Sequence, residues 1–223
     1  MNFSVSEENY IKSIYHLQRS DGMVSTNELA SLLQTKPASV TDMLKKLKTK
    51  KLLQYEKYQG FKLSELGKKV ALTIIRKHRL WEFFLVNKLA FGWDQVHEIA
   101  EELEHISSPL LIEKLDAFLH FPKFDPHGDP IPDSNGKMET SKQISLIDLA
   151  TDKMAEVSAV GSQSTELLEL LRHKKIGIGT LLEVVRKFNF DNSIEIKIKG
   201  LSAFSISEQL AQTLFVKIVY DAK

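Results

Sequence analysis

Three histidines and three glutamates in the middle of the chain have the residue types and the spacing of a metal-binding group. The members of this set are His78, Glu82, His97, Glu101, Glu104 and His105. Most of them recur at intervals of four residues in two successive predicted helices, and residues four apart lie about one turn from each other on one helix face. The pattern predicts one or two divalent-metal sites between these helices. The alternative is a surface helix that carries paired Glu and His without a ligand.

The ligand types narrow the choice of metal. The chain has no cysteine, which excludes a disulfide scaffold, a thiolate zinc site and a cysteine nucleophile. Imidazole with carboxylate oxygens suits Mn(II), Fe(II), Co(II) or Zn(II). A Gly-rich phosphate loop, an HExxH motif and a G-x-S-x-G motif are all missing from the sequence, so we expect no enzyme. His127 lies in a proline-rich segment, where we expect a structural role.

Helical periodicity predicts the elements that position this set. Three helices are expected over about residues 65–89, 95–107 and 109–120. Trp81 and Phe84 are among the residues that give the first of these helices more apolar surface than so few helices can cover, which predicts a homodimer. Residues 121–141 contain four of the six prolines, and we expect an ordered turn followed by a linker there.

The first 64 residues have the order helix, short helix, turn, helix and β-hairpin. A capped amphipathic helix is predicted to begin at Ser6, a second begins after Ser25, and Pro37 starts the third. Two short strands follow, with a tip at residues 58–60. This order is that of a winged helix-turn-helix, in which the second helix of the pair enters the DNA major groove. The alternative is a helical bundle that happens to end in a hairpin.

The charge of this region favours contact with a polyanion. The whole chain has a formal net charge of only +1, but its first 64 residues contain ten basic and six acidic side chains. Lysines suit phosphates, while Ser, Thr and Asp can meet base edges. The residues predicted to contact double-stranded DNA are Lys36, Pro37, Ala38, Ser39, Thr41, Asp42, Lys45, Lys46, Tyr58 and Gln59.

The C-terminal part has a different composition. From about residue 144, short β-type runs surround one helix, predicted over residues 165–173, and such closely spaced strands indicate a small barrel. The predicted fold class is therefore mainly α with a small β domain. With 43% hydrophobic and 26% charged residues, no apolar run long enough for a membrane span and no signal-peptide pattern, we expect a cytoplasmic protein without membrane contact.

The ordered motifs RKHRLWEFFLV, QVHEIAEELEHIS and FPKFDPHGDPIP, which follow the winged helix, resemble the diphtheria toxin repressor and manganese transport regulator family of metal-dependent repressors. The resemblance covers residues 5–133, and the C-terminal region is similar to the SH3-like barrel of the FeoA type that longer members carry. It implies a winged helix-turn-helix domain over 1–64, a helical metal-binding and dimerisation domain with a Pro-rich linker over 65–141, and the barrel over 142–223.

The resemblance also implies two metal sites. The first comprises His78, Glu82 and His97, with Gln163 and Glu166 of the barrel. The second comprises Glu101, Glu104 and His105, with Asn9 of the first helix. Glu101 stands where iron-responsive members have a cysteine and manganese-responsive members a carboxylate, which favours Mn(II) over Fe(II), with Zn(II) or Co(II) binding in vitro. Lys12 replaces an acid of some short manganese regulators, so their particular two-metal cluster is not implied.

The function implied by the resemblance is that of a metal-dependent repressor of metal-uptake genes. A homodimer would bind a pseudo-palindromic operator when Mn(II), or alternatively Fe(II), joins the first helix to the dimerisation helices. Two further hypotheses stay open. One is a winged-helix regulator without a metal effector, in which the His and Glu residues are superficial. The other is an enzyme that uses the same pairs, although the sequence shows no general base distinct from the ligands.

Overall fold

The computed structural model describes residues 3–18, 22–56 and 60–219. The chain forms two compact units, and the long helix α4 (Glu65–Leu89) contributes residues to both. The first unit comprises Met1–Trp81, Glu101–Phe121 and Pro132–Met138, and the second comprises Glu82–Ala100, Pro122–Ile131 and Glu139–Lys223. Within the described residues, no helix combines the length and the apolar composition that crossing a membrane requires.

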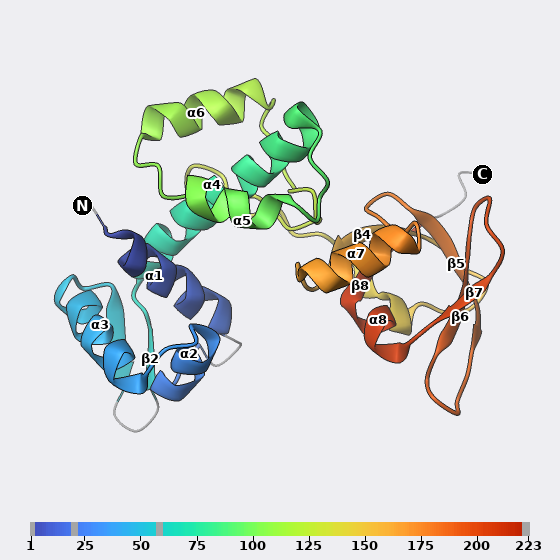
Figure 1. Cartoon of the computed structure of the whole chain (residues 1–223), viewed down its shortest axis with the longest axis horizontal. Coiled ribbons are helices and arrows are strands. Elements are labelled where there is room, and N and C mark those ends of the chain that lie inside the picture. The colour runs from blue at the N-terminus through green and yellow to red at the C-terminus, as the bar shows by residue number, and fades with distance from the viewer. Residues whose placement is uncertain (1–2, 19–21, 57–59, 220–223) are drawn as a thin grey trace. The chain divides into compact units, whose positions relative to one another are not determined.

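The first unit begins with three helices and a β-hairpin (Figure 1). The elements are α1 (Val5–Leu17), α2 (Thr26–Leu32), α3 (Pro37–Thr49), β1 (Leu53–Glu56) and β2 (Gly60–Leu63), and the two strands pair antiparallel. The prediction that Ser6 begins the first helix is wrong, because Ser4 forms a capping box with Glu7 and the helix starts at Val5. Tyr58 and Gln59, predicted at the hairpin tip, lie outside the described residues.

A buried apolar core holds these elements together. Its fully buried members include Ile11 and Ile14 of α1, Val40 and Leu47 of α3, and Phe61 of β2. Because Val40 and Leu47 are seven residues apart, they fix one face of α3 towards this core and leave the opposite face in solvent. The core therefore decides which side of α3 is available to a partner.

Three further helices follow, α4, α5 (Val96–Leu103) and α6 (Pro109–Phe118). Helix α4 has the predicted bounds, whereas α5 ends before the predicted residue 107 and Ser108 caps α6. In the first unit, Arg76 on α4 donates to Asp116 on α6 at 2.6 Å and to the Pro132 carbonyl at 2.8 Å. These contacts hold α6 and the segment after residue 132 against α4.

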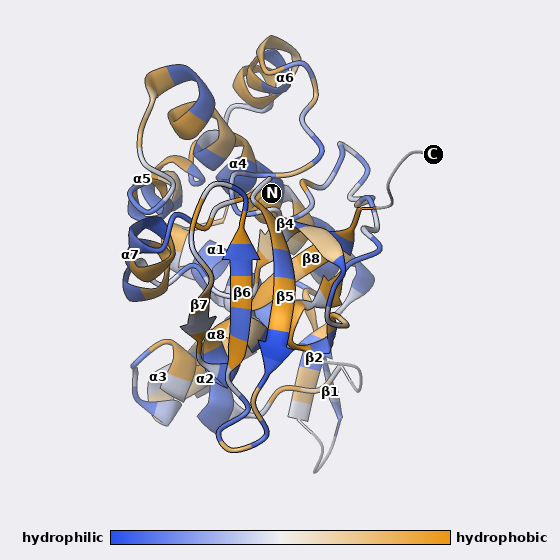
Figure 2. Cartoon of the chain, turned by 90° about the vertical axis from the view of Figure 1, so that its right-hand side faces the viewer, coloured by the Kyte–Doolittle hydropathy of each residue, from blue (hydrophilic) through white to orange (hydrophobic). Residues whose placement is uncertain are grey.

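The second unit contains an antiparallel six-stranded sheet in the order β3-β8-β4-β5-β6-β7. Its elements are β3 (Ile144–Ser145), η1 (Leu146–Asp148), β4 (Met154–Val160), α7 (Thr165–His173), β5 (Leu181–Lys187), β6 (Ile194–Ile198), β7 (Phe204–Ile206), α8 (Glu208–Thr213) and β8 (Leu214–Ile218). Hydrophilic and hydrophobic residues alternate along β6 (Figure 2), and its inward residues Ile194 and Ile196 are fully buried. The β-type runs of the sequence at 156–160, 180–185, 194–198 and 214–219 correspond to β4, β5, β6 and β8, and the predicted helix 165–173 is α7, while β3, β7 and α8 were not predicted.

Candidate metal centre

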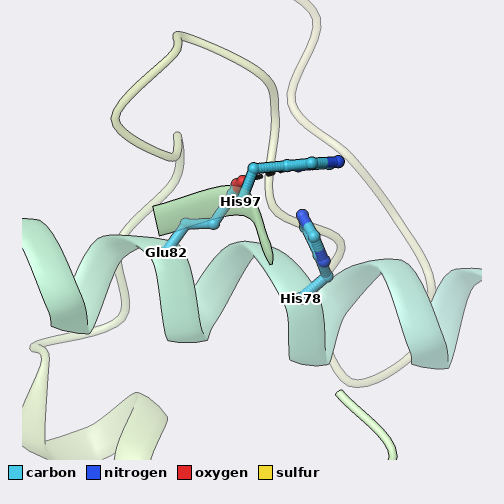
Figure 3. A group of neighbouring side chains, drawn as sticks. All are labelled: His78, Glu82 and His97. Atoms are coloured by element: carbon cyan, nitrogen blue, oxygen red, sulfur yellow. Dashed lines mark hydrogen bonds and ion pairs between the residues drawn. The ribbon is translucent and has the colours of Figure 1, made fainter. Parts of the chain in front are cut away.

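Helix α4 places His78 and Glu82 one turn apart, and α5 brings His97 to them (Figure 3). One potential ligand atom from each residue lies within 4.8 Å of the other two, and His97 Nδ1 is 3.4 Å from Glu82 Oε1. Glu82 is fully buried, while the His97 side chain is 40% exposed. The predicted residues His78, Glu82 and His97 therefore form one group of two imidazoles and a carboxylate, whose donors suit a divalent metal.

A second group shares Glu82 and was missed by the sequence analysis. Glu82, Asp125 and His127 are all buried, and each offers a ligand atom within 4.8 Å of the other two. His127 Nδ1 is 3.7 Å from Glu82 Oε2, which is beyond hydrogen-bond reach. The structural role expected for His127 stays a prediction, and its position beside Glu82 and Asp125 makes it a candidate ligand as well. The sequence did contain a signal for this group, because Asp125 precedes His127 by two residues in a segment that is expected to begin with an ordered turn. We call the five residues of the two groups the Glu82 centre: His78, Glu82, His97, Asp125 and His127.

Backbone contacts position the turn that carries Asp125 and His127. Asp125 Oδ1 accepts hydrogen bonds from the backbone N–H groups of His127 at 2.8 Å and Asp129 at 3.0 Å. The His127 carbonyl accepts a hydrogen bond of 3.0 Å from the end of β4. Gly128 has φ +87°, and a Cβ at this position would collide with the Ser158 carbonyl oxygen of β4. Only glycine lets the turn approach the strand this closely, so β4 sets the position of His127.

The contacts of the His127 ring determine which nitrogen can bind a ligand. Nε2 is 2.8 Å from the Trp93 carbonyl oxygen, which can only accept, so Nε2 carries a hydrogen and Nδ1 faces Glu82. Burial lowers the pKa of His127, but the carboxylates of Glu82 and Asp125 outweigh it and raise this pKa above its ordinary value. A proton and a metal ion therefore compete for Nδ1. The centre fits a divalent cation, since buried carboxylates and an oriented imidazole converge there.

Gln163 and Glu166, the predicted ligands from the barrel, line a pocket of about 530 Å³ together with His97. Gln163 Nε2 donates to Asp129 Oδ2 at 3.1 Å. Glu166 lies in the first turn of α7 and is exposed. Gln163 and Glu166 therefore line the same pocket as His97. Their role as ligands stays a prediction.

The other predicted set is arranged differently. Among the described residues, Glu101, Glu104 and His105 do not form a third group of converging ligand atoms. The ammonium group of Lys12 lies between the two glutamates, with Nζ 2.7 Å from Glu104 Oε1 and 3.3 Å from Glu101 Oε1. Glu104 Oε2 is 2.7 Å from His78 Nδ1. A lysine of α1 thus occupies the space that the resemblance assigned to a metal ion.

Glu8 contacts His105 from α1. Its Oε2 atom is 2.5 Å from His105 Nδ1. Asn9, the residue predicted to bind metal from α1, is half-buried and follows Glu8 in the helix. Its role as a ligand stays a prediction.

Glu104 is the central anion of this cluster. Burial would raise the pKa of Glu104, but the hydrogen bond with His78 and the positive charge of Lys12 outweigh it and lower the pKa below its ordinary value. The carboxylate is therefore ionised at neutral pH and is shared by Lys12 and His78. Histidines that bind metals commonly donate their other ring N–H to a carboxylate, and the contact between Glu104 and His78 has this form.

The outward face of α3 is polar and solvent-accessible. The exposed residues are Lys36, Pro37, Ala38, Ser39, Thr41, Asp42, Lys45 and Lys46. Lys45 Nζ donates a hydrogen bond of 3.0 Å to Asp42 Oδ1, so the positive charge of Lys45 offsets the negative charge of Asp42. All eight described residues of the predicted DNA surface are thus accessible to solvent.

Comparison with known proteins identifies three matching family models in chain order. Residues 2–61 match "Iron dependent repressor, N-terminal DNA binding domain", residues 64–133 match "Iron dependent repressor, metal binding and dimerisation domain", and residues 144–218 match the FeoA domain. The transcriptional regulator MntR of Oceanobacillus iheyensis is 34% identical over 120 residues, which cover 54% of this chain and 81% of MntR. The chain belongs to the family of metal-dependent transcriptional repressors. These repressors are DNA-binding proteins and not enzymes.

Other metal-dependent repressors are similar over most of the chain. The diphtheria toxin repressor of Corynebacterium jeikeium is 26% identical over 182 residues, which cover 81% of this chain and 76% of that protein. A solved manganese-dependent transcriptional repressor in complex with manganese has a TM-score of 0.84 at 30% identity and covers 96% of this chain and 100% of its own. The repressor ScaR with bound Cd²⁺ has a TM-score of 0.77 at 31% identity, over 96% of this chain and 99% of its own. The FeoA domain is thus part of the shared architecture.

Proposed function

We propose that this metal-dependent repressor responds to Mn(II), acts in the cytoplasm and controls metal-uptake genes. The Glu82 centre is the observation that carries this proposal, because its donors are carboxylate oxygens and imidazole nitrogens without sulfur. Glu101 is exposed and offers a carboxylate where iron-responsive members have a thiol. The manganese-dependent repressors among the similar structures support the same metal. The proposal includes the division of the chain into the three domains 1–64, 65–141 and 142–223.

The residues of the Glu82 centre would hold the ion and transmit its presence to the DNA-binding elements. When bound, the cation supplies positive charge that neutralises buried carboxylates. Glu82 and His78 hold it from α4, and His97 holds it from α5. Glu104 contacts Nδ1 of His78 through Oε2, and the same carboxylate binds the ammonium group of Lys12 on α1. This line of contacts connects the Glu82 centre to the helix that packs against α2 and α3.

Helix α3 would enter the major groove of double-stranded DNA. Its basic residues Lys45 and Lys46 are placed to meet phosphates, and Ser39, Thr41 and Asp42 near its beginning are placed to meet base edges. A homodimer would present two such helices to a pseudo-palindromic operator.

Helix α6 supports the proposed homodimer. Leu110, Phe118 and Phe121 on or beside this helix are 57–63% exposed. Trp81 of the long helix, by contrast, is only 9% exposed. The apolar surface that requires cover is thus on α6 more than on α4. Burying such a surface against a second copy removes it from water.

A DNA-binding titration tests the proposed function. We expect the purified chain to bind DNA from metal-uptake promoters with Mn(II) and to release it on addition of a chelator, with a difference in affinity of roughly 5–150-fold. Equal binding under the two conditions would contradict a metal effector.

Fe(II) is the second candidate, since the iron-dependent repressor IdeR of Mycobacterium tuberculosis is 30% identical over 125 residues. Activation midpoints measured under anaerobic conditions separate the two metals. A lower midpoint for Fe(II) than for Mn(II) would replace manganese by iron in the proposal.

Metal binding to the Glu82 centre should weaken as the pH falls. The raised pKa of His127 means that a proton occupies Nδ1 at pH values where an ordinary histidine is neutral, and this proton must leave when metal binds. We expect Mn(II) affinity to fall by up to about tenfold per pH unit below that pKa and to level off above it. Isothermal titration of the wild type and of His127→Gln measures this. The variant should bind more weakly with a shallower slope, whereas His173→Gln, a change at an exposed residue of α7, should keep the wild-type slope. A slope unchanged in His127→Gln would contradict the assignment.

A further inference from the structure

The cluster around Glu101 and Glu104 already contains a cation, the ammonium group of Lys12. Nζ lies 2.7 Å from Glu104 Oε1, 2.8 Å from Glu104 Oε2 and 3.3 Å from Glu101 Oε1. The Lys12 side chain is 13% exposed, and that of Glu104 is fully buried. The ammonium therefore contacts both oxygens of the buried carboxylate, through which Glu104 would have to bind a metal ion.

A metal ion does not fit on these oxygens beside the ammonium. Divalent metals bind carboxylate oxygens at about 2.0–2.2 Å, so an ion on Glu104 would be in direct contact with Nζ and would repel its charge. Displacing Lys12 would take a nearly buried ammonium from its main partner, and an uncompensated buried charge is strongly disfavoured. The geometry thus opposes the metal site that the family resemblance implies for Glu101, Glu104 and His105.

The charge of the surroundings leads to the same result. The carboxylates of the cluster are Glu8, Glu101 and Glu104, and the ammonium groups are Lys12 and Lys77, whose Nζ is 3.8 Å from Glu8 Oε1. Two imidazoles, of His78 and His105, each contact one of the carboxylates. Among the described contacts of this cluster, three negative charges are thus opposed by two positive charges before either imidazole takes up a proton. A divalent ion in addition would leave the cluster with an excess of positive charge.

We propose that Lys12 is the resident cation of this cluster. Its ammonium group holds α1 to α5 in the place of a metal ion, and the chain binds divalent metal only at the Glu82 centre. Helix α1 is then fastened to the end of α5 with or without metal. Metal acts on α1 indirectly, through His78 and the Glu104 carboxylate that Lys12 shares. This proposal concerns which site binds metal, and it holds whether Mn(II) or Fe(II) is the physiological ion.

Counting bound Mn(II) in a background without the Glu82 centre tests the proposal. Equilibrium dialysis followed by elemental analysis gives the number of ions per chain. We expect no stoichiometric Mn(II) binding in Glu82→Gln and about one ion per chain in the double variant Lys12→Glu/Glu82→Gln, where the ammonium is replaced by a further ligand. Lys68→Glu/Glu82→Gln is the matched control, because Lys68 pairs only with exposed Glu65 among the contacts described, and it should bind none.

Two outcomes of this count overturn the proposal. One is an ion retained by Glu82→Gln and lost when Glu104→Gln is added, which would place metal on Glu104 beside Lys12. The other is the failure of the double variant to bind any ion while its circular dichroism and unfolding transition match those of Glu82→Gln. Lys12 would then not be what excludes metal.

Amine labelling of the wild-type protein provides a measurement that does not depend on any variant. Lys12 should resist reductive methylation equally in metal-free and Mn(II)-loaded protein, because its ammonium stays against Glu104. Lys45, whose side chain is 72% exposed, should react in both states and serves as the internal control. Mass spectrometry of the digested protein reads both sites. An increase in Lys12 labelling on metal addition would show that the ion displaces the ammonium, and would overturn the proposal.

Discussion

Replacement of Glu82 by glutamine should abolish the metal response of DNA binding. Glu82 is fully buried and is the residue common to both groups of converging ligands, with Oε1 on the side of His97 and Oε2 on the side of His127. The amide has almost the same shape but no negative charge, so the fold is retained while the attraction for a cation is lost. Changes to residues that merely support a metal ligand cost about 10–100-fold in affinity. We therefore expect a loss of at least about 100-fold in Mn(II) affinity for Glu82→Gln.

Fluorescence anisotropy with operator DNA at increasing Mn(II) concentration measures this effect. Glu82→Gln should bind DNA at the level of the metal-free wild type at every concentration. Glu102→Gln is the matched control, because Glu102 is an exposed glutamate of α5, and its response should equal that of the wild type. A Glu82→Gln variant with a normal Mn(II) midpoint would show that the effector ion binds elsewhere.

The relative losses in two histidine variants distinguish the two groups that share Glu82. His127 is completely buried and held through Trp93 and β4, whereas His97 is partly exposed. If the ion is held mainly by Glu82, Asp125 and His127, replacing His127 should cause the larger loss of Mn(II) affinity. If it is held mainly by His78, Glu82 and His97, replacing His97 should cause the larger loss. The shared carboxylate is required in both cases, which is why Glu82→Gln has the larger expected effect.

Local sequence signals predicted both helices that carry the first group, although α5 ends before the predicted residue 107. The apolar periodicity of α4 predicted its bounds, Glu65–Leu89, and spacing along one helix then placed His78 beside Glu82. Helix α7 was predicted with the same success over Thr165–His173. The short strands β3 and β7 and the helix α8 were missed, because two or three residues show no alternation and the six residues of α8 make less than two helical turns.

Contacts between distant segments could not be obtained from spacing. His127 lies beside Glu82 because Gly128 lets its turn pack against β4. Neither a glycine nor a histidine at these positions predicts that the turn packs there. Lys12 is 92 residues from Glu104, and no local pattern indicates that its ammonium lies between two glutamates. Lys12 departs from the acid of some short manganese regulators, but only the packing of α1 against the end of α5 shows what this lysine contacts.

Removal of the Glu104 carboxylate should strongly destabilise the metal-free protein. Among the described residues, Glu104→Leu leaves the half-exposed Glu101 as the carboxylate partner of the Lys12 ammonium, and it removes the carboxylate that contacts buried His78. Breaking a buried ion pair from one side typically costs 3–5 kcal/mol, so we expect the free energy of unfolding to fall by about this amount. Urea unfolding in the presence of a chelator measures it without a contribution from bound metal.

A double-mutant cycle shows whether this loss belongs to the pair. Lys12→Met keeps the apolar stem of the side chain and removes its charge, so the double variant Lys12→Met/Glu104→Leu buries neither charge. Because apolar side chains often replace a buried ion pair at little cost, the double variant should be more stable than Glu104→Leu alone, with a coupling free energy within the range of about 0.5–3 kcal/mol found for residues in contact. The exposed pair Asp42 and Lys45 is the control, since both side chains are 72% exposed and such pairs contribute about 0–1 kcal/mol. Additive losses at Lys12 and Glu104 would mean that the two side chains act independently, and the connection from the Glu82 centre to α1 would then have to run through other residues.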